Sequence, residues 1–261
     1  MTGSLHRGRN SSVPKSWAIA QKMGISSAMQ RFRNRVMAKI DLIIFDCDGV
    51  LVDSEILSCG CLCEALASHG IDLDINGALE LFVGRSTAAV HEHYGAVGRV
   101  LPERFSAELK ARVRETFAAS LSPIEGVRAT LDALRLPICV ASSSDLDRVS
   151  LSLALTGLSG YFGERLYSSQ MVKHGKPAPD LFLYAAATMH ADPHRTLVIE
   201  DSVSGVKAAK AAGMKVWGFV GGSHYALRDG RAILQAAGAD RVFARMSDFS
   251  PGGLEGFDGI G

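Results

Sequence analysis

The sequence predicts an α/β protein with a doubly wound, Rossmann-like parallel-sheet core and an inserted α-helical cap. Short apolar runs typical of buried strands recur along the chain, and helices separate most of them. This alternation indicates a parallel sheet with helical crossovers. Residues 55–121, by contrast, show mostly helical periodicity without strand-like alternation, so they form the predicted insertion.

The predicted elements follow from where apolar runs begin and where breakers end them. The first strand is the apolar run that ends at Phe45. Further strands are predicted at 137–141, 165–168, 196–199, 215–220 and 241–243, and helices at 54–69, 78–82, 86–94, 107–119, 126–135, 146–155, 180–189 and 206–212. We therefore expect an α/β core of residues 37–54 and 124–250, a cap of residues 55–123 and a loose, Gly-rich tail at 251–261.

Charge is distributed unevenly along the chain. Residues 1–40 hold eight Lys or Arg and no Asp or Glu, whereas the rest of the chain holds 20 basic and 27 acidic residues. Because the main body is acidic, we expect it not to bind nucleic acid in general. We also expect no membrane association, since no apolar run approaches the roughly 18 residues of a membrane span.

Residues 1–36 are rich in Ser, Arg and Lys, and three interpretations compete. The segment has the composition of a transit peptide, and it could also be a basic arm for an anionic partner. The third interpretation, which we favour, is an upstream extension from a misplaced start codon, because Met37 stands just before the first strand. In each case we expect a flexible extension without a core-forming pattern.

The five cysteines do not suggest a disulfide framework. An odd number in a chain of this length suits a reducing compartment, so we expect a cytoplasmic protein. Cys59, Cys61 and Cys63 alternate along a predicted helix, and only Cys59 and Cys63 share a face. We interpret them as small buried hydrophobic residues rather than as metal ligands.

Polar residues stand at the carboxyl ends of the predicted strands, where open α/β sheets bind ligands. Asp46 and Asp48 follow the first strand, and an isolated buried carboxylate there is costly unless it is paired or bound to a metal. The alternative is an ordinary Asp-Gly turn. Three serines, Ser142–Ser144, end the second strand and precede a helix, which makes an anion cradle, although Ser144 or Asp145 could also cap that helix.

Two further strand ends complete the predicted site. Pro177 and Pro179 follow Lys176 and hold the backbone extended before the next helix. This lysine is therefore expected to be a fixed cation rather than a mobile surface side chain. Glu200 and Asp201 end the fourth strand. Carboxylates that converge at one place repel one another, and Mg²⁺ is the cation best suited to such oxygen ligands beside a phosphate. A carboxylate nucleophile, a metal and a lysine together are suited to phosphoryl transfer.

Four strings of the chain, DCDGVLVDS, VASSS, GKPAPD and VIEDSVSG, resemble the four motifs of the haloacid dehalogenase superfamily. The match is to its phosphatase branch with a helical cap after the first motif, which includes β-phosphoglucomutase and sugar-phosphate phosphatases. The resemblance covers roughly residues 41–220. The whole chain is similar to bacterial phosphatases that act on sugar acids and related sugar phosphates.

The resemblance implies a role for each motif residue. Asp46 is the nucleophile that becomes an aspartyl-phosphate, and Asp48 is the general acid and then the base. The phosphoryl group is held by Ser142, Ser143 and Lys176, and Mg²⁺ by Asp46, the backbone carbonyl of Asp48, and Asp201, with Glu200 in or beside its coordination shell. Arg85 matches a cap arginine that contacts substrate in the mutase.

The predicted function is Mg²⁺-dependent hydrolysis of a small phosphorylated metabolite by a monomer or small homo-oligomer. One alternative is a phosphosugar mutase. Where the mutase has a histidine on the first cap helix, this chain has Ser58, and no His occurs between Asp48 and His69. The second alternative is a non-catalytic regulator that keeps the fold, which the intact motif residues make unattractive.

Overall fold

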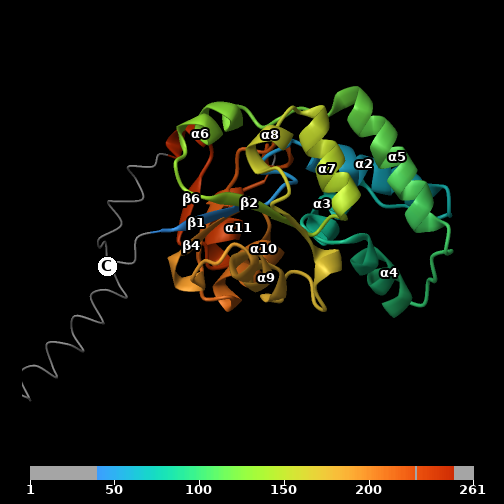
Figure 1. Cartoon of the computed structure of the whole chain (residues 1–261). Coiled ribbons are helices and arrows are strands. Elements are labelled where there is room, and N and C mark those ends of the chain that lie inside the picture. The colour runs from blue at the N-terminus through green and yellow to red at the C-terminus, as the bar shows by residue number, and fades with distance from the viewer. Residues whose placement is uncertain (1–39, 227, 250–261) are drawn as a thin grey trace, which may run out of the picture. The chain divides into compact units, whose positions relative to one another are not determined.

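Six parallel strands form one sheet in the order β3–β2–β1–β4–β5–β6 (Figure 1). The structure, a computed structural model, describes residues 40–226 and 228–249. β1 (Leu42–Phe45) pairs with β2 (Ile138–Ser142) on one side and with β4 (Thr196–Glu200) on the other. The strand order therefore reverses at β1, and ligands bind open α/β sheets in the crevice at such a switch point.

The other elements surround these three strands. The remaining strands are β3 (Leu166–Ser168), β5 (Lys215–Phe219) and β6 (Arg241–Phe243). The helices are α2 (Glu55–Ala67), α3 (Ile75–Phe82), α4 (Thr87–Ala96), α5 (Phe105–Ser120), α6 (Val127–Ala133), α7 (Leu146–Leu155), α8 (Ser159–Phe162), α9 (Asp180–Thr188), α10 (Val203–Ala211) and α11 (Gly230–Ala236). Short 3₁₀ helices lie at Ser169–Met171, Pro193–Arg195, Ser223–Tyr225 and Met246–Asp248.

Each face of the sheet has its own apolar core, because successive side chains of a strand point to opposite faces. Ile43 and Phe45 belong to the core that also contains side chains of α6, α7 and α8. Leu42 and Ile44 belong to the core on the other face, which contains side chains of α9, α10 and α11. Figure 1 shows these two sets of helices above and below the sheet. The doubly wound fold predicted from the sequence is confirmed.

Helices α2–α5, which we call the cap helices, come between β1 and β2 in the chain. They have an apolar cluster of their own, which includes Leu66, Phe82, Phe105 and Phe117. Figure 1 shows them gathered to one side of the sheet. Because the cap helices bury apolar side chains mainly against one another, they form a distinct layer of the fold. Their domain boundaries at 55 and 123 stay a prediction.

A glycine turn between α3 and α4 connects the cap helices to the core. Gly84 has a φ of +70°, and its carbonyl oxygen accepts hydrogen bonds of 3.0 Å from both Ser143 Oγ and Ser204 Oγ. A Cβ atom at this position would lie 2.3 Å from the Cβ of Ser202. Glycine is therefore required here both by the left-handed backbone and by the close approach.

The structure differs from the predicted elements in a few places. α10 begins at Val203 instead of 206, because Ser202 caps the helix by accepting a hydrogen bond from the Gly205 N–H. The sequence did not predict α8 or α11, which have only four and seven residues. The predictions for residues 1–36 and for the tail at 251–261 lie outside the described residues.

Two other predictions concern cysteines and membranes. All five cysteines are free; Cys59 and Cys61 are buried, as predicted for small hydrophobic residues, and Cys63 is half-buried. No helix within the described ranges has both the length and the apolar character that crossing a bilayer requires.

Candidate active site

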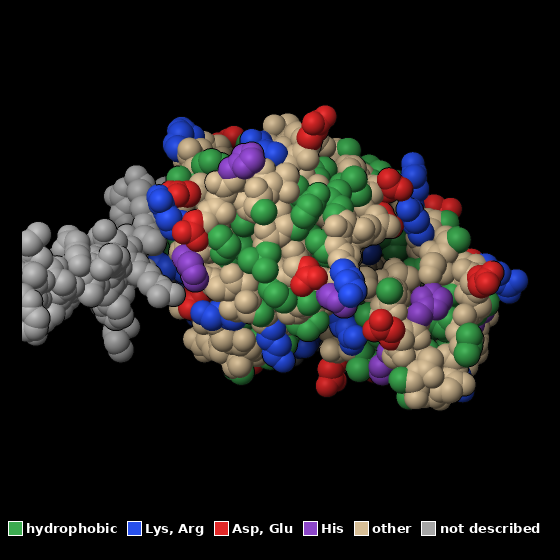
Figure 2. All heavy atoms as spheres, turned by 60° about the horizontal axis from the view of Figure 1, so that its bottom comes forward, with side chains coloured by type: hydrophobic (Ala, Val, Ile, Leu, Met, Phe, Trp, Pro, Cys, Tyr) green, Lys and Arg blue, Asp and Glu red, His purple; other side chains and the backbone are tan. Residues whose placement is uncertain are grey.

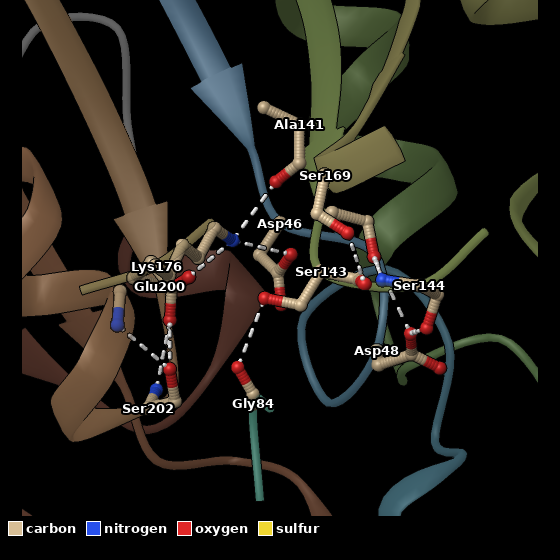
Figure 3. A network of polar contacts seen from close by, with 12 residues as sticks. Asp46, Asp48, Gly84, Ala141, Ser143, Ser144, Ser169, Lys176, Glu200 and Ser202 are labelled. Carbon is tan, nitrogen blue, oxygen red and sulfur yellow. Dashed lines mark hydrogen bonds and ion pairs between the residues drawn. The ribbon is translucent and has the colours of Figure 1, made fainter. Parts of the chain in front are cut away.

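A buried lysine connects the ends of three neighbouring strands. Lys176 Nζ donates to Asp46 Oδ1 at 2.8 Å, to Glu200 Oε1 at 2.6 Å and to the Ala141 carbonyl oxygen at 2.9 Å (Figure 3). Its ammonium group also lies 4.8 Å from the centroid of the Phe182 ring. Burial alone would lower the pKa of Lys176, but the two carboxylates outweigh it and raise the pKa above its ordinary value. The lysine is therefore a fixed cation, as predicted.

Three carboxylates gather beside this lysine. Oxygen atoms of Asp46, Glu200 and Asp201 all lie within 4.8 Å of one another, and the three residues are buried. The pKa values of Asp46 and Asp201 are raised, first by burial and then by the neighbouring carboxylates, while Lys176 partly opposes the shift. One lysine does not neutralise three acids, so the cluster is suited to accept another cation.

The carboxylate of Asp201 is the best indication of where that cation would bind. Both of its oxygens are buried, and neither receives a hydrogen bond from the part of the chain that the structure describes. His224 Nε2 lies 3.1 Å from Oδ2 but without hydrogen-bond geometry. Both oxygens of Glu200, by contrast, are occupied, by Lys176 and by the backbone N–H and hydroxyl of Ser202. Oxygen ligands of this kind fit Mg²⁺. Asp46 and Asp201 would hold it directly, and Glu200 orients the lysine.

Asp48 points to a different set of donors. Its Oδ1 accepts hydrogen bonds from Ser54 Oγ at 2.6 Å and from Arg148 Nη2 at 2.8 Å, and its Oδ2 accepts one from Ser144 Oγ at 2.7 Å. Burial would raise the pKa of Asp48, but Arg148 and the hydroxyl donors outweigh it and lower the pKa. In this arrangement Asp48 is a carboxylate that can accept a proton.

The three serines at the end of β2 were predicted to bind an anion, with helix capping as a possible second role for Ser144. Ser142 is buried, and its hydroxyl lies 3.5 Å from Asp48 Oδ2 and accepts a hydrogen bond from the Ser144 N–H. Ser143 donates to Gly84 of the cap helices. Helix capping falls to Asp145, whose Oδ1 accepts from the Arg148 N–H at 2.8 Å. Helix capping therefore does not occupy the serine hydroxyls, because it uses a different residue.

These side chains surround a cavity of about 70 Å³ between the strand ends and the cap helices. Asp46, Asp48, Ser142 and Ser143 line its core side, and Arg85 lines it from the cap. Arg85 is exposed, and its Nη1 donates to the Leu81 carbonyl oxygen at 3.3 Å. The structure thus brings all the predicted site residues to one end of the sheet, with Arg85 at the edge.

Sequence reasoning missed several residues of this site. Arg148 binds Asp48, Glu55 is a buried acid that lines the cavity, and His224 is buried against Asp201. Burial first, and then Asp201 and Asp48, raise the pKa of Glu55 to about 8. A signal was present for Arg148, which follows the capping Asp145 by three residues in the helix after the serines. Nothing local in the sequence distinguishes His224 from a surface histidine.

Comparison with known proteins agrees with this geometry. The family model of haloacid dehalogenase-like hydrolases matches residues 40–213. The chain belongs to this family of hydrolases. It is 30% identical over 190 residues, 72% of this chain and 86% of the other, to 6-phosphogluconate phosphatase of Escherichia coli K12. It is 31% identical over 183 residues, 66% of this chain and 80% of the other, to hexitol phosphatase B of the same organism.

A solved structure of another haloacid dehalogenase-like hydrolase is also similar. It comes from Deinococcus radiodurans R1 and contains bound phosphate and sodium. Its TM-score is 0.63 at 35% sequence identity, and the match covers 81% of this chain and 93% of that one. The family resemblance predicted from the four motifs is therefore confirmed.

The unpaired carboxylate predicts a binding property that can be measured without turnover. Millimolar Mg²⁺ is expected to raise the melting temperature of the protein, because a ligand that binds only the folded state stabilises it. Asp201→Asn should abolish this response. Its melting temperature without metal should equal or exceed that of the wild type, since one buried like charge is removed. Differential scanning calorimetry checks both results.

Asp72→Asn, which removes one exposed carboxylate in the loop before α3, is the matched control and should keep the full response. A Mg²⁺ response of normal size in Asp201→Asn would show that the metal binds elsewhere.

Proposed function

We propose that this protein is a Mg²⁺-dependent phosphatase that hydrolyses a small phosphate monoester, a sugar, sugar-acid or polyol phosphate, through an aspartyl-phosphate intermediate. The observation that carries the proposal is the position of Asp46. Its carboxylate lies at the switch point of the sheet, 2.8 Å from a buried lysine and beside two further acids. The names of the two relatives support the substrate class, and the phosphate in the related structure supports phosphate binding.

The first step transfers the phosphoryl group to the protein. An oxygen of the Asp46 carboxylate attacks phosphorus, and the bond between phosphorus and the ester oxygen breaks. Asp48 takes up a proton before this step and gives it to the leaving alkoxide, which departs as an alcohol. In the second step a water molecule attacks phosphorus, Asp48 takes its proton, and the bond to Asp46 breaks to release inorganic phosphate. The two steps together consume one water and regenerate both aspartates.

The surrounding groups match the charge of the transferred group. Lys176 supplies a positive charge beside Asp46, and Ser142 and Ser143, between the end of β2 and α7, line the same cavity. When bound at Asp46 and Asp201, Mg²⁺ would neutralise part of the charge of the phosphoryl oxygens. Lys176 also keeps Asp46 in place between β2 and β4, so the nucleophile needs little rearrangement before attack.

The size of the cavity at Asp46 supports a division of the substrate into two parts. At about 70 Å³ it suits a compact phosphoryl group. A second cavity of about 280 Å³ lies between α5 of the cap helices and α7 of the core, and both cavities are lined by Thr87, Leu109, Val113 and Arg148. The larger cavity approaches the volume of an ordinary small-molecule site. It would take the part of the substrate that leaves as an alcohol.

The charge pattern of the surface is consistent with a small-molecule partner. On the face that Figure 2 shows, acidic and basic side chains are interspersed, and a hollow lies to the right of its centre. We propose that the protein acts on a phosphorylated metabolite without nucleic acid or membrane, in the cytoplasm, as a monomer or small homo-oligomer.

The mechanism predicts that Asp46→Asn abolishes turnover. The amide cannot form the acyl phosphate, while the fold should persist because the amide still fits the same space. Phosphate release from several sugar phosphates should fall by at least about 10³-fold, and brief incubation of the wild type with substrate should give a phosphorylated peptide containing Asp46 in mass spectrometry. Normal activity of the folded variant, or of the wild type in excess chelator, would contradict the proposal.

Proton transfer by Asp48 predicts a dependence on the leaving group. Asp48→Asn should slow hydrolysis of alkyl phosphates by about 10² to 10⁴, the usual value of general acid-base help. Hydrolysis of nitrophenyl phosphate should slow less, because nitrophenolate leaves without a proton. The ratio of the two rates in the variant and the wild type measures the effect. An equal loss on both substrates would mean that Asp48 only organises the site.

The structure also bears on the mutase alternative. A mutase must pass the phosphoryl group to a sugar hydroxyl before water reaches it. Ser58, which stands where the mutase has its histidine, binds Arg148 instead. With β-glucose 1-phosphate and a trace of the bisphosphate, phosphorus NMR should show inorganic phosphate accumulating faster than glucose 6-phosphate. Faster formation of glucose 6-phosphate would favour the mutase.

Arg85→Ala should raise KM for sugar phosphates more than for nitrophenyl phosphate.

A further inference from the structure

We propose that Arg148 recognises an anionic group, such as a carboxylate, on the leaving portion of the substrate, and that the protein prefers phosphate monoesters which carry one. This inference rests on the proposed phosphatase function and narrows its substrate class. It assigns a specificity-determining role to an arginine outside the four motifs of the family.

Arg148 joins the core to the cap helices. From α7 of the core, its Nη2 donates to Asp48 Oδ1 at 2.8 Å and to Ser58 Oγ of α2 at 2.7 Å. Its guanidinium carbon lies 5.0 Å from the ring centroid of Phe117 of α5. Ser58 in turn donates to the Ser54 carbonyl oxygen, and Ser54 Oγ donates to Asp48. Arg148 is therefore held at the point where the loop after β1, helix α2 and helix α5 meet.

The guanidinium has unused capacity to bind an anion. All of its hydrogen bonds to described residues come from Nη2, and Nε is buried without an acceptor. A guanidinium offers five N–H donors in a planar fork that matches a carboxylate or phosphate with two parallel bonds. A buried donor without an acceptor is unusual in proteins and calls for a partner. A substrate anion is suited to provide it.

The position of Arg148 also fits a contact to the leaving group. It lines both the cavity at Asp46 and the larger cavity between α5 and α7, so a substrate that extends from one into the other passes its guanidinium. The larger cavity has other basic residues, of which Lys110 is already paired with Asp145 and Asp147, and Arg114 has no ion pair among the described residues. Arg85 lines only the smaller cavity.

The ion pair with Asp48 couples recognition to the reaction. To reach the leaving oxygen, Asp48 must turn away from Arg148, and this would leave the guanidinium without its anion. A carboxylate on the substrate replaces Asp48 as the partner of Arg148 and frees Asp48 for the leaving oxygen. A substrate whose leaving portion is uncharged cannot replace Asp48 in this way. Substrates with an anionic leaving portion should therefore have a higher kcat as well as a lower KM.

Two substrates that differ in one group test the proposal. 6-Phosphogluconate and glucitol 6-phosphate share a six-carbon chain and a phosphate ester, but the first ends in a carboxylate and the second in a hydroxymethyl group. The wild type is expected to favour 6-phosphogluconate at least tenfold in kcat/KM. Arg148→Met should reduce this ratio to within about twofold of one. Arg148→Lys, which keeps the charge without the planar fork, should lie between.

The control is Arg112→Met, which removes a cap arginine that pairs with Glu64 at the surface and should keep the wild-type ratio. An unchanged ratio in Arg148→Met would overturn the proposal. So would an equal fall on both substrates and on nitrophenyl phosphate, because Arg148 would then serve only to hold Asp48. If Arg148→Met does not fold, by circular dichroism, Arg148→Lys provides the same comparison with a smaller expected change.

A binding measurement separates this inference from the phosphatase proposal. In the Asp46→Asn background, calorimetric titration should show at least tenfold tighter binding of 6-phosphogluconate than of glucitol 6-phosphate, and adding Arg148→Met should remove the difference. If the wild type hydrolyses no phosphate monoester but this selectivity is present, the phosphatase proposal fails and the recognition role stands. If the wild type hydrolyses both esters and no selectivity is found, the recognition role alone fails.

Discussion

The charge balance around Lys176 is the constraint on which the rest of the site depends. A single buried ammonium bonds to groups that follow or end three adjacent strands: Asp46 after β1, the carbonyl oxygen of Ala141 in β2 and Glu200 in β4. These contacts exist only if β2, β1 and β4 are neighbours in parallel register. Breaking one partner of a buried ion pair typically costs about 3–5 kcal/mol, because the other charge stays buried. The sheet order and the nucleophile are therefore fixed together.

The same balance favours a metal ion over a second lysine as the further cation of the proposed site. Both oxygens of Glu200 already accept hydrogen bonds, one from Lys176 and two from Ser202. Among the described residues, none donates a hydrogen bond to either carboxylate oxygen of Asp201, although His224 Nε2 lies 3.1 Å from its Oδ2. A divalent cation bound by several oxygens satisfies such a carboxylate and leaves room for a phosphoryl oxygen. The lysine and a bound metal would thus have separate places around Asp46.

Asp46 and Asp48 show how two residues of one motif acquire different properties. Asp46 is crowded by other acids and buried, which raises its pKa, whereas Asp48 is surrounded by Arg148, Ser54 and Ser144, which lower its pKa. The difference comes from their partners, since both aspartates are buried after the same strand.

The sequence predicted the residues that follow strand ends, and the reason is geometric. A strand delivers the next residue to the edge of the sheet, so Asp46, Ser142 and Asp201 could be assigned to one site from the positions of apolar runs alone. The sheet and most helices were predicted for the same reason, since periodicity is local. The seven-residue helix α11 was not predicted, and the start of α10 was placed three residues too late because Ser202 caps the helix before Val203.

The residues that contact the leaving group are of another kind. Arg148 is 90 residues from Ser58 and 100 from Asp48 in sequence, and these contacts depend on how the cap helices pack on the core. No short string of sequence encodes such a set, so a motif can identify phosphoryl transfer while leaving the alcohol undetermined. Relatives of this chain near 30% identity are named for a sugar-acid phosphate and for hexitol phosphates. A difference of that kind can arise at one guanidinium between two cavities without altering the strand ends, which would allow one scaffold to change substrate while the nucleophile, the lysine and the metal ligands stay the same.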